Sequence, residues 1–212
     1  MDADAVEIRV LGCLIEKQRT TPDAYPLSLN SLRLACNQST NRDPVVQYDE
    51  RQIKDALERM SNRGWTRFAS GASSRALKYR HLLDEALSLS GAEISLLAVL
   101  MLRGPQTLGE LKARTERLHP FESLQEVAVT LDALAGRELA ARLPRRPGQK
   151  EDRYSQLLGG EEGESAAAAE MEAQPSRTEN RDDRIGGLEA RLARVEETLN
   201  ELVARLDNVP RS

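Results

Sequence analysis

The sequence of 212 residues is poor in the residue types that carry most protein chemistry. It contains two cysteines, two histidines, one Trp, four Tyr and two Phe, and aromatic residues make up 3% of the chain. Two cysteines rule out a disulfide scaffold and suit a reducing compartment. Two histidines and two cysteines leave little room for a zinc site. So few aromatic side chains argue against a stacking platform for single-stranded nucleic acid.

Long apolar runs are also missing. No stretch of about 18 apolar residues is present, so we expect no membrane span, and the N-terminal MDADAVEIRV lacks the basic start of a secretory signal. With the low cysteine content, this predicts a cytoplasmic protein without a membrane partner.

Motifs of enzyme active sites are absent as well. The sequence has no P-loop, GxGxxG, HExxH or CxxC pattern. His81 and His119 lack the neighbouring groups needed for nucleophilic catalysis. We interpret Cys13 and Cys36, which stand in apolar surroundings, as small buried hydrophobes. The sequence therefore predicts a protein without catalytic residues, metal or cofactor.

Charge is distributed unevenly along the chain. Residues 1–88 carry 13 basic and 12 acidic groups and residues 89–158 carry 10 and 9, whereas residues 159–212 carry 7 and 13. Composition changes at residue 159, where GGEEGESAAAAEMEAQP predicts a flexible acidic linker. We divide the chain into two small domains, 1–88 and 89–158, a linker, 159–177, and a tail, 178–212.

The two predicted domains are an internal repeat. Residues 7–15 match 93–101 at an offset of 86, and Leu29-x-x-Leu32 matches Leu108-x-x-Leu111 at 79. Residues 53–63 match residues 127–137 at an offset of 74, and Tyr79 matches Tyr154 at an offset of 75. The order of the matches is kept while the connections shorten, which indicates a duplicated domain rather than a solenoid.

Each copy reads as three helices followed by a hairpin. In the first copy the apolar spacing predicts helices around 8–15, 29–37 and 50–63, then strands at 65–69 and 76–81. In the second copy it predicts helices at 93–102, 108–115 and after Ser123, then strands at 139–143 and 153–157. Asp49 with Gln52, and Ser123 with Glu126, have capping-box spacing. This order predicts a mainly α, α+β fold of two tandem winged helix-turn-helix domains.

Three stretches of the sequence resemble the YceH family of uncharacterised bacterial proteins: Leu11–Pro44, Leu102–Phe121 and Leu143–Tyr154. The resemblance covers roughly residues 5–158 and implies a tandem winged-helix fold. It implies no established activity and no catalytic residues. The sequence departs from the family pattern at Ser39-Thr40, where a Lys-Ser pair is frequent, and at Gln156, where His is common. The first departure removes a positive charge from the loop before the third helix.

A winged-helix fold directs attention to double-stranded DNA, because the third helix of such a domain enters the major groove while basic groups bind phosphates. The candidate DNA contacts are basic residues of the third helix, the preceding loop and the wings: Arg42, Arg51, Lys54, Arg59, Arg75, Arg145, Arg146 and Lys150. In the first copy, Asp55 and Glu58 lie on the same face of the third helix as these basic residues. The simpler alternative to a DNA contact at Lys54 is a surface ion pair with Glu58. The third helix of the second copy has almost no positive charge before Arg137.

The polar run 37–44 is longer than a helix-turn-helix turn needs. Its Asn and Asp side chains can bond to nearby backbone, so a self-capping loop is the favoured interpretation. A contact to a ligand, partner or phosphate is the alternative.

The tail carries an unbroken heptad seam with apolar residues spaced alternately three and four apart: Ile185, Leu188, Leu192, Val195, Leu199, Leu202, Leu206 and Val209. This pattern predicts a coiled coil and a homodimer. An amphipathic helix docked on its own globular part is the alternative. Two functions remain open: a regulator-like DNA-binding protein dimerised by its tail, and a scaffold whose winged helices dock other proteins without DNA contact.

Overall fold

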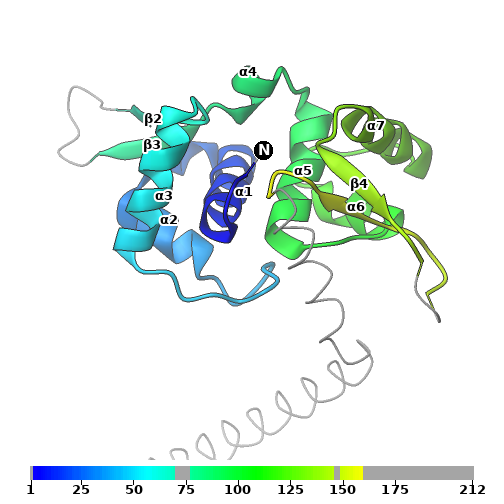
Figure 1. Ribbon diagram of the computed structural model, residues 1–212, viewed down its shortest axis with the longest axis horizontal. Helices are drawn as coiled ribbons and strands as arrows, with labels where there is room; N and C mark the ends of the chain where they lie inside the picture. The colour runs from blue at the N-terminus through cyan, green and yellow to red at the C-terminus, as the bar shows by residue number, and fades with distance from the viewer. Residues whose placement is uncertain (1, 70–76, 146–148, 160–212) are drawn as a thin grey trace, which may run out of the picture. The chain divides into compact units, whose positions relative to one another are not determined.

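The computed structural model describes residues 2–69, 77–145 and 149–159 (Figure 1). These residues form an α+β fold in which helices dominate and the strands build small antiparallel sheets. The first repeat contains α1 (Ala5–Thr20), the 3-10 turn η1 (Pro22–Ala24), β1 (Leu27–Ser28), α2 (Leu29–Cys36), α3 (Glu50–Asn62), β2 (Thr66–Ala69) and β3 (Lys78–His81). The second contains α5 (Gly91–Arg103), α6 (Leu108–Thr115), α7 (Leu124–Gly136), β4 (Ala140–Leu143) and β5 (Arg153–Gln156). The helix–helix–helix–hairpin order predicted for both copies is present.

Helices begin at equivalent positions in the two repeats. α1 and α5 start with complete capping boxes, Asp4 with Glu7 and Ser90 with Glu93, at the predicted offset of 86. The caps of the second and third helices follow the offsets of 79 and 74: Ser28 and Thr107, then Asp49 and Ser123. Each cap oxygen accepts a backbone N–H that the first turn leaves without a helical partner.

One predicted cap is only half formed. Ser123 accepts the N–H of Glu126 at 3.1 Å, but the Glu126 carboxylate accepts the N–H of Glu122 instead of that of Ser123. The predicted capping box at α7 was wrong in this respect. Asp49 and Gln52 form the full box at α3.

Strand pairing repeats the sequence match in three dimensions. In the first sheet, ordered β1-β3-β2, Leu27 pairs with Tyr79. In the second repeat β4 pairs with β5, and Gln106 forms an antiparallel bridge to Tyr154. The pair Leu27–Tyr79 of the first repeat therefore corresponds to the pair Gln106–Tyr154 of the second. Gln106 lies 79 residues after Leu27, and Tyr154 lies 75 residues after Tyr79. The short strand β1 has too few residues to leave a sequence pattern, and it was not predicted.

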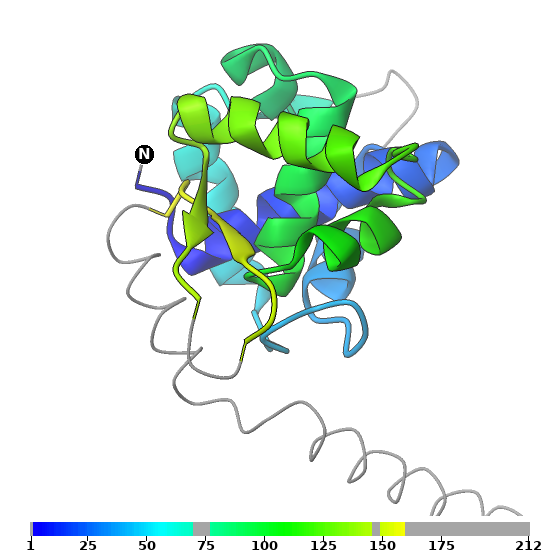
Figure 2. The same ribbon diagram turned by 90° about the vertical axis from the view of Figure 1, so that its right-hand side faces the viewer.

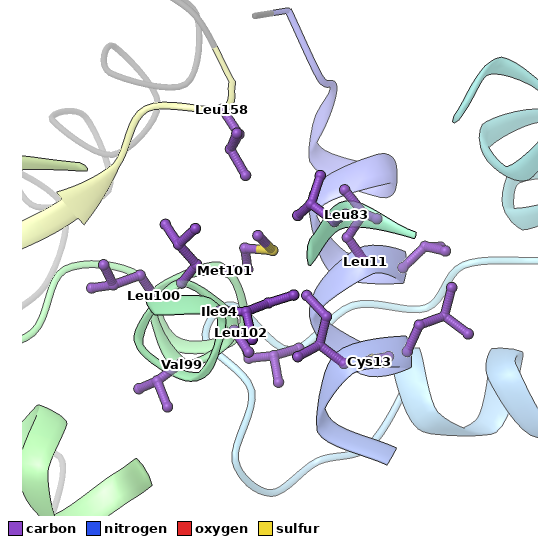
Figure 3. Packing of buried hydrophobic residues seen from close by; sticks show 14 of the residues in the cluster. Leu11, Cys13, Leu83, Ile94, Val99, Leu100, Met101, Leu102 and Leu158 are labelled. Atoms are coloured by element: carbon purple, nitrogen blue, oxygen red, sulfur yellow. The ribbon is translucent and has the colours of Figure 1, made fainter. Parts of the chain in front are cut away.

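The core lies where the first helices of the two repeats meet. α1 crosses α5, and Leu11, Ile94 and Leu102 are buried where the two helices pack together (Figure 3). α1 also packs against α2 and α3, and α5 against α6 and α7 (Figures 1 and 2). The two repeats thus share one continuous apolar core.

The connection between the repeats is packed rather than free. It forms the short helix α4 (Leu83–Leu87), in which Leu83 is fully buried, and Leu89 is 9% exposed. Residues 2 and 3 pair with residues 158 and 159, and the Ala3 N–H donates to the Leu158 carbonyl at 2.9 Å. Contacts therefore join the start of the first repeat to the end of the second.

All the described residues belong to one compact unit. The predicted coiled coil, 178–212, and all of the predicted linker except Gly159 lie outside the described residues. In the described part of the chain, no helix is both long and apolar enough to cross a membrane.

Candidate nucleic-acid interface

Helix α3 presents a mixed charged face to solvent. Its apolar stripe of Ile53, Ala56, Leu57 and Met60 is buried. On the opposite face the side chains of Arg51 and Lys54 are 89% and 61% exposed. They lie 3.9 Å and 3.8 Å from Asp55 and Glu58, one turn further along. Exposed i,i+4 pairs of this kind contribute only a few tenths of a kcal/mol and are screened by salt, so both cations can change partners.

Arg59 faces a different set of groups. Its Nε donates to the buried carboxylate of Glu7 at 3.0 Å, and its Nη2 pairs with Asp4. Arg63 donates to the same Glu7 at 3.2 Å and lies over the Trp65 ring, 5.2 Å from its centroid. The predicted contact residue Arg59 therefore serves to join α3 to the start of α1.

Arg42 is removed from the surface. Its side chain is 0% exposed and pairs with Glu16 of α1 at 2.6 Å. It also donates to the carbonyl of Ala35 at 3.1 Å and to the Gln38 amide oxygen at 3.0 Å. Its predicted place among phosphate contacts is corrected: a buried guanidinium with these partners supports the C-terminal end of α2.

The long polar loop after α2 bonds to itself. The Asn37 side chain donates to the Tyr48 carbonyl at 2.8 Å and accepts the Tyr48 N–H at 2.9 Å, which closes the loop. Arg9 reaches from α1 to the carbonyls of Cys36 and Pro44. The self-capping interpretation agrees with these bonds. Arg9 and Glu16 were missed by the sequence reasoning, although charged residues in an apolar helix were a signal.

The hairpin of β2 and β3 exposes apolar side chains at its far end, on the same side of the sheet that faces the core near α1. Thr66, Tyr79 and His81 on this side are buried, but Phe68 and Leu77 are 47% and 58% exposed. Phe68 packs on Tyr79 with the ring centroids 5.3 Å apart. The candidate residue Arg75 lies outside the described residues.

The second repeat differs most at its third helix. α7 buries Val127, Leu131 and Leu134 but exposes Leu124 and Val129, which are 50% and 57% accessible. No Lys or Arg lies within α7. The exposed side of α7 thus offers no cation to a phosphate, and its exposed Leu124 and Val129 stand among exposed polar residues such as Gln125 and Asp132.

In the hairpin of β4 and β5, basic side chains pair with an acidic residue of the same hairpin. Arg145 Nε lies 2.6 Å from Asp152, and Arg142 pairs with the same carboxylate. The hydrogen bond from Arg145 is the main cause that holds the pKa of Asp152 below its usual value. Lys150 is exposed, and Arg146 lies outside the described residues. Within the ranges described, three or more His, Cys, Asp or Glu side chains do not cluster as metal ligands would.

Comparison with known proteins shows one family. The profile described as "Protein of unknown function, DUF480" matches residues 3–149. The chain is 48% identical over 192 residues to a UPF0502 protein of Citrifermentans bemidjiense, covering 90% of this chain and 88% of the relative. It is 43% identical over 207 residues to a UPF0502 protein of Pseudomonas syringae pv. tomato, covering 92% and 93%.

Proposed function

The chain belongs to the DUF480 family, and from that premise we propose that it is a non-enzymatic winged-helix protein that binds double-stranded DNA through α3 of its first repeat. The observation that carries the proposal is the exposure of Arg51 and Lys54 on the face of α3 opposite the core. In helix-turn-helix proteins the N-terminal residues of the recognition helix contact DNA, and both cations lie in the first turns of α3.

Charge limits the mode of binding. The first repeat has a net charge of +1, and Asp55 and Glu58 lie on the same face as the two cations. Non-specific affinity grows with the number of phosphates neutralised. We therefore expect a small phosphate footprint, and weak binding to random sequence.

Gel shifts or fluorescence anisotropy on a random duplex, measured from about 50 mM salt upward, test this function. The double variant Arg51→Ala/Lys54→Ala should reduce the slope of log K against log salt by about two, one for each lost contact. The matched control is Lys112→Ala/Arg117→Ala, which removes the same charge from the second repeat. Absence of binding by the full chain at low salt would refute the proposal, and equal slopes for both variants would refute the role of α3.

A protein-docking function is the second candidate, and exposed Leu124 and Val129 on α7 favour it. Under this function the second repeat binds a partner protein through α7. Leu124→Ser/Val129→Ser should then abolish capture of a partner from nuclease-treated lysate while DNA binding is unchanged. Capture that needs nucleic acid, or that survives this variant, would count against docking by α7.

A further inference from the structure

Among the described residues, the hairpin of β2 and β3 leaves one strand edge unpaired. The sheet order β1-β3-β2 places β2 at this edge. The Leu82 N–H donates to the Trp65 carbonyl at 2.7 Å, so Trp65 and every second residue after it direct their backbone groups toward β3. Phe68 falls between two such residues, and its N–H and C=O point away from β3. In the part of the chain that the structure describes, neither group forms a hydrogen bond, so both are available to an added strand.

The core-facing side of this hairpin ends in an exposed apolar pair, Phe68 and Leu77. Phe68 lies directly opposite Tyr79, and Leu77 precedes Tyr79 by two residues, so the three side chains share one face. Tyr79 is buried, whereas about half of Phe68 and of Leu77 is exposed. The Phe68 ring packs on the Tyr79 ring, which holds it beside the free edge. Covering this pair would remove apolar surface from water, which favours association.

The opposite side of the same hairpin is cationic. Arg67 of β2 pairs directly with Arg80 of β3, and Lys78 lies two residues before Arg80 on the same side. Like charges directly opposite each other in a sheet are destabilising. Glu85 lies 3.6 Å from Arg80, but no carboxylate of the described residues forms an ion pair with Arg67 or Lys78. A carboxylate supplied by a partner would offset this repulsion.

The second repeat provides an internal comparison, because the hairpin of β4 and β5 has the same register. Phe68 and Leu77 correspond there to Arg142 and Asp152, and these two side chains pair with each other. A charged side chain on the core-facing side of an edge strand is a common protection against pairing with another chain. The fold therefore accommodates a protected edge at this position, and β2 lacks the protection that β4 has.

The opposite side of the second hairpin differs as well. Arg67 and Arg80 correspond to Ala141 and Ser155, so the repulsive cation pair is replaced by two small residues. The register does not require cations at these positions. The exposed apolar pair and the facing arginines thus distinguish the first hairpin from its own duplicate, on both sides of the same edge strand.

We propose that the free edge of β2 binds an extended segment of another protein in which acidic and apolar side chains alternate. Successive side chains of a strand point to opposite faces, so the apolar ones cover Phe68 and Leu77 while the carboxylates face Arg67 and Arg80. A second copy of β2 fits less well, because it would add another arginine to a face that already holds like charges. This docking site is separate from α3 and α7, and it does not depend on DNA binding.

The test measures the binding of two fluorescent peptides to the full-length protein by anisotropy. One peptide alternates glutamate with valine, and the other has lysine in place of every glutamate. We expect the acidic peptide to bind and the basic peptide not to bind. Phe68→Ser/Leu77→Ser should weaken binding of the acidic peptide by about tenfold or more, because the apolar contact is lost. The matched control is Leu124→Ser/Val129→Ser, which removes two exposed apolar side chains from α7 and should bind like the wild type.

A charge reversal tests the cationic side. Arg67→Glu/Arg80→Glu should exchange the preference, so that the basic peptide binds and the acidic one does not. Binding of neither peptide to the wild type, or equal binding of both, would overturn the proposal. Equal affinities of the hairpin and α7 variants for the acidic peptide, with circular dichroism showing both folded, would overturn the assignment to β2.

Residues 169–173 of the chain itself, AEMEA, have the same alternation of acidic and apolar side chains. The variant Glu170→Lys/Glu172→Lys separates this occupant from another protein. We expect this variant to bind the acidic peptide with the affinity of the wild type. Binding that appears only in this variant would assign the edge of β2 to the chain's own acidic segment and would overturn the proposal of a separate partner.

Discussion

Gly12 of α1 lies directly against Leu102 of α5. A Cβ atom on this glycine would be 2.9 Å from Cγ and Cδ2 of the leucine, and 3.1 Å from Cβ of Met101. The two helices approach each other closely here because one of them has no side chain. This approach joins the cores of the two repeats.

Gly12→Ala should therefore destabilise the protein by about 1–3 kcal/mol, because overpacking at Leu102 outweighs the better helix propensity of alanine. Urea unfolding followed by circular dichroism measures the change. The control is Gly109→Ala in α6, where a Cβ atom meets nothing within 4 Å. That variant should gain up to about 1 kcal/mol. A loss at Gly109 as large as at Gly12 would contradict the packing argument.

Glu7 is the buried carboxylate that joins α1 to α3. Its side chain is 1% exposed and accepts from Arg59 and Arg63, and it also closes the capping box at Asp4. Glu7→Gln keeps the shape and loses the charge, so we expect a loss of about 2 kcal/mol in unfolding free energy.

The matched control for this variant is Glu93→Gln, at the equivalent position of the second repeat. Glu93 closes the same kind of box at Ser90 and lies 3.3 Å from Arg137. It should lose less than about 1 kcal/mol. Because glutamine can also close a capping box, both variants keep the box, and equal losses at the two positions would contradict the role of the two arginines at Glu7.

His81 makes the folded state sensitive to acid. Burial lowers its pKa to about 4, and the charges of Arg19 and Arg80 act in the same direction against Asp84. Its Nε2 lies 2.7 Å from the Gln18 amide oxygen, and its Nδ1 lies 3.5 Å from Asp84. The unfolded chain takes up a proton near pH 6.5, whereas the folded protein takes it up only near pH 4.

The contribution of neutral His81 to the free energy of unfolding is thus fully present above pH 6.5. It is lost as the pH falls toward 4, which lowers the free energy of unfolding by up to roughly 3 kcal/mol. Denaturant unfolding across this range should show a shallower acid loss for His81→Gln than for the wild type. Asp84→Asn should steepen the loss, because Asp84 is the group that favours the protonated ring. A wild-type and a His81→Gln profile of equal slope would contradict this prediction.

Self-association is predicted from the tail sequence alone, since residues 160–212 lie outside the described structure. With Ile185 at position a, Arg184 and Arg191 fall at g, and Glu189 and Glu196 fall at e. A parallel pair of helices places each arginine opposite a glutamate, whereas an antiparallel pair places like charges together.

Sedimentation equilibrium of the full chain should show a dimer, and Leu192→Asp/Leu199→Asp should reduce it to a monomer. Exchange of Arg191 for Glu should weaken the dimer, and adding Glu196→Arg should restore it. A wild-type protein that is monomeric at tens of micromolar would refute the role of the tail. A Leu192→Asp/Leu199→Asp variant that still dimerises like the wild type would refute it as well.

Local patterns in the sequence were sufficient to predict the helices and the longer strands. The spacing at Ile53, Leu57 and Met60 predicts α3, and Asp49 predicts its start within one residue. The repeat offsets, found in the sequence alone, reappear in the caps and in the bridge from Gln106 to Tyr154. These features succeed because a helix cap and an apolar stripe depend on residues three or four apart.

The candidate site was less predictable, because the tertiary structure determines which residue a charged side chain pairs with. Arg42, Arg51 and Arg59 look alike in sequence. The fold buries Arg42 beside Glu16, exposes Arg51, and turns Arg59 toward Glu7, 52 positions away. No local pattern distinguishes these three outcomes.

The sequence by itself determined the α+β class, the duplication and the order of elements within each copy, since these depend on short-range periodicity and capping. Only the tertiary structure decided that α1 packs on α5 at Gly12, and that Arg9 of α1 binds the carbonyl of Cys36 at the end of α2. The physical reason is that burial and charge pairing are set by which helices come together. That depends on the free energy of the whole core rather than on any one segment.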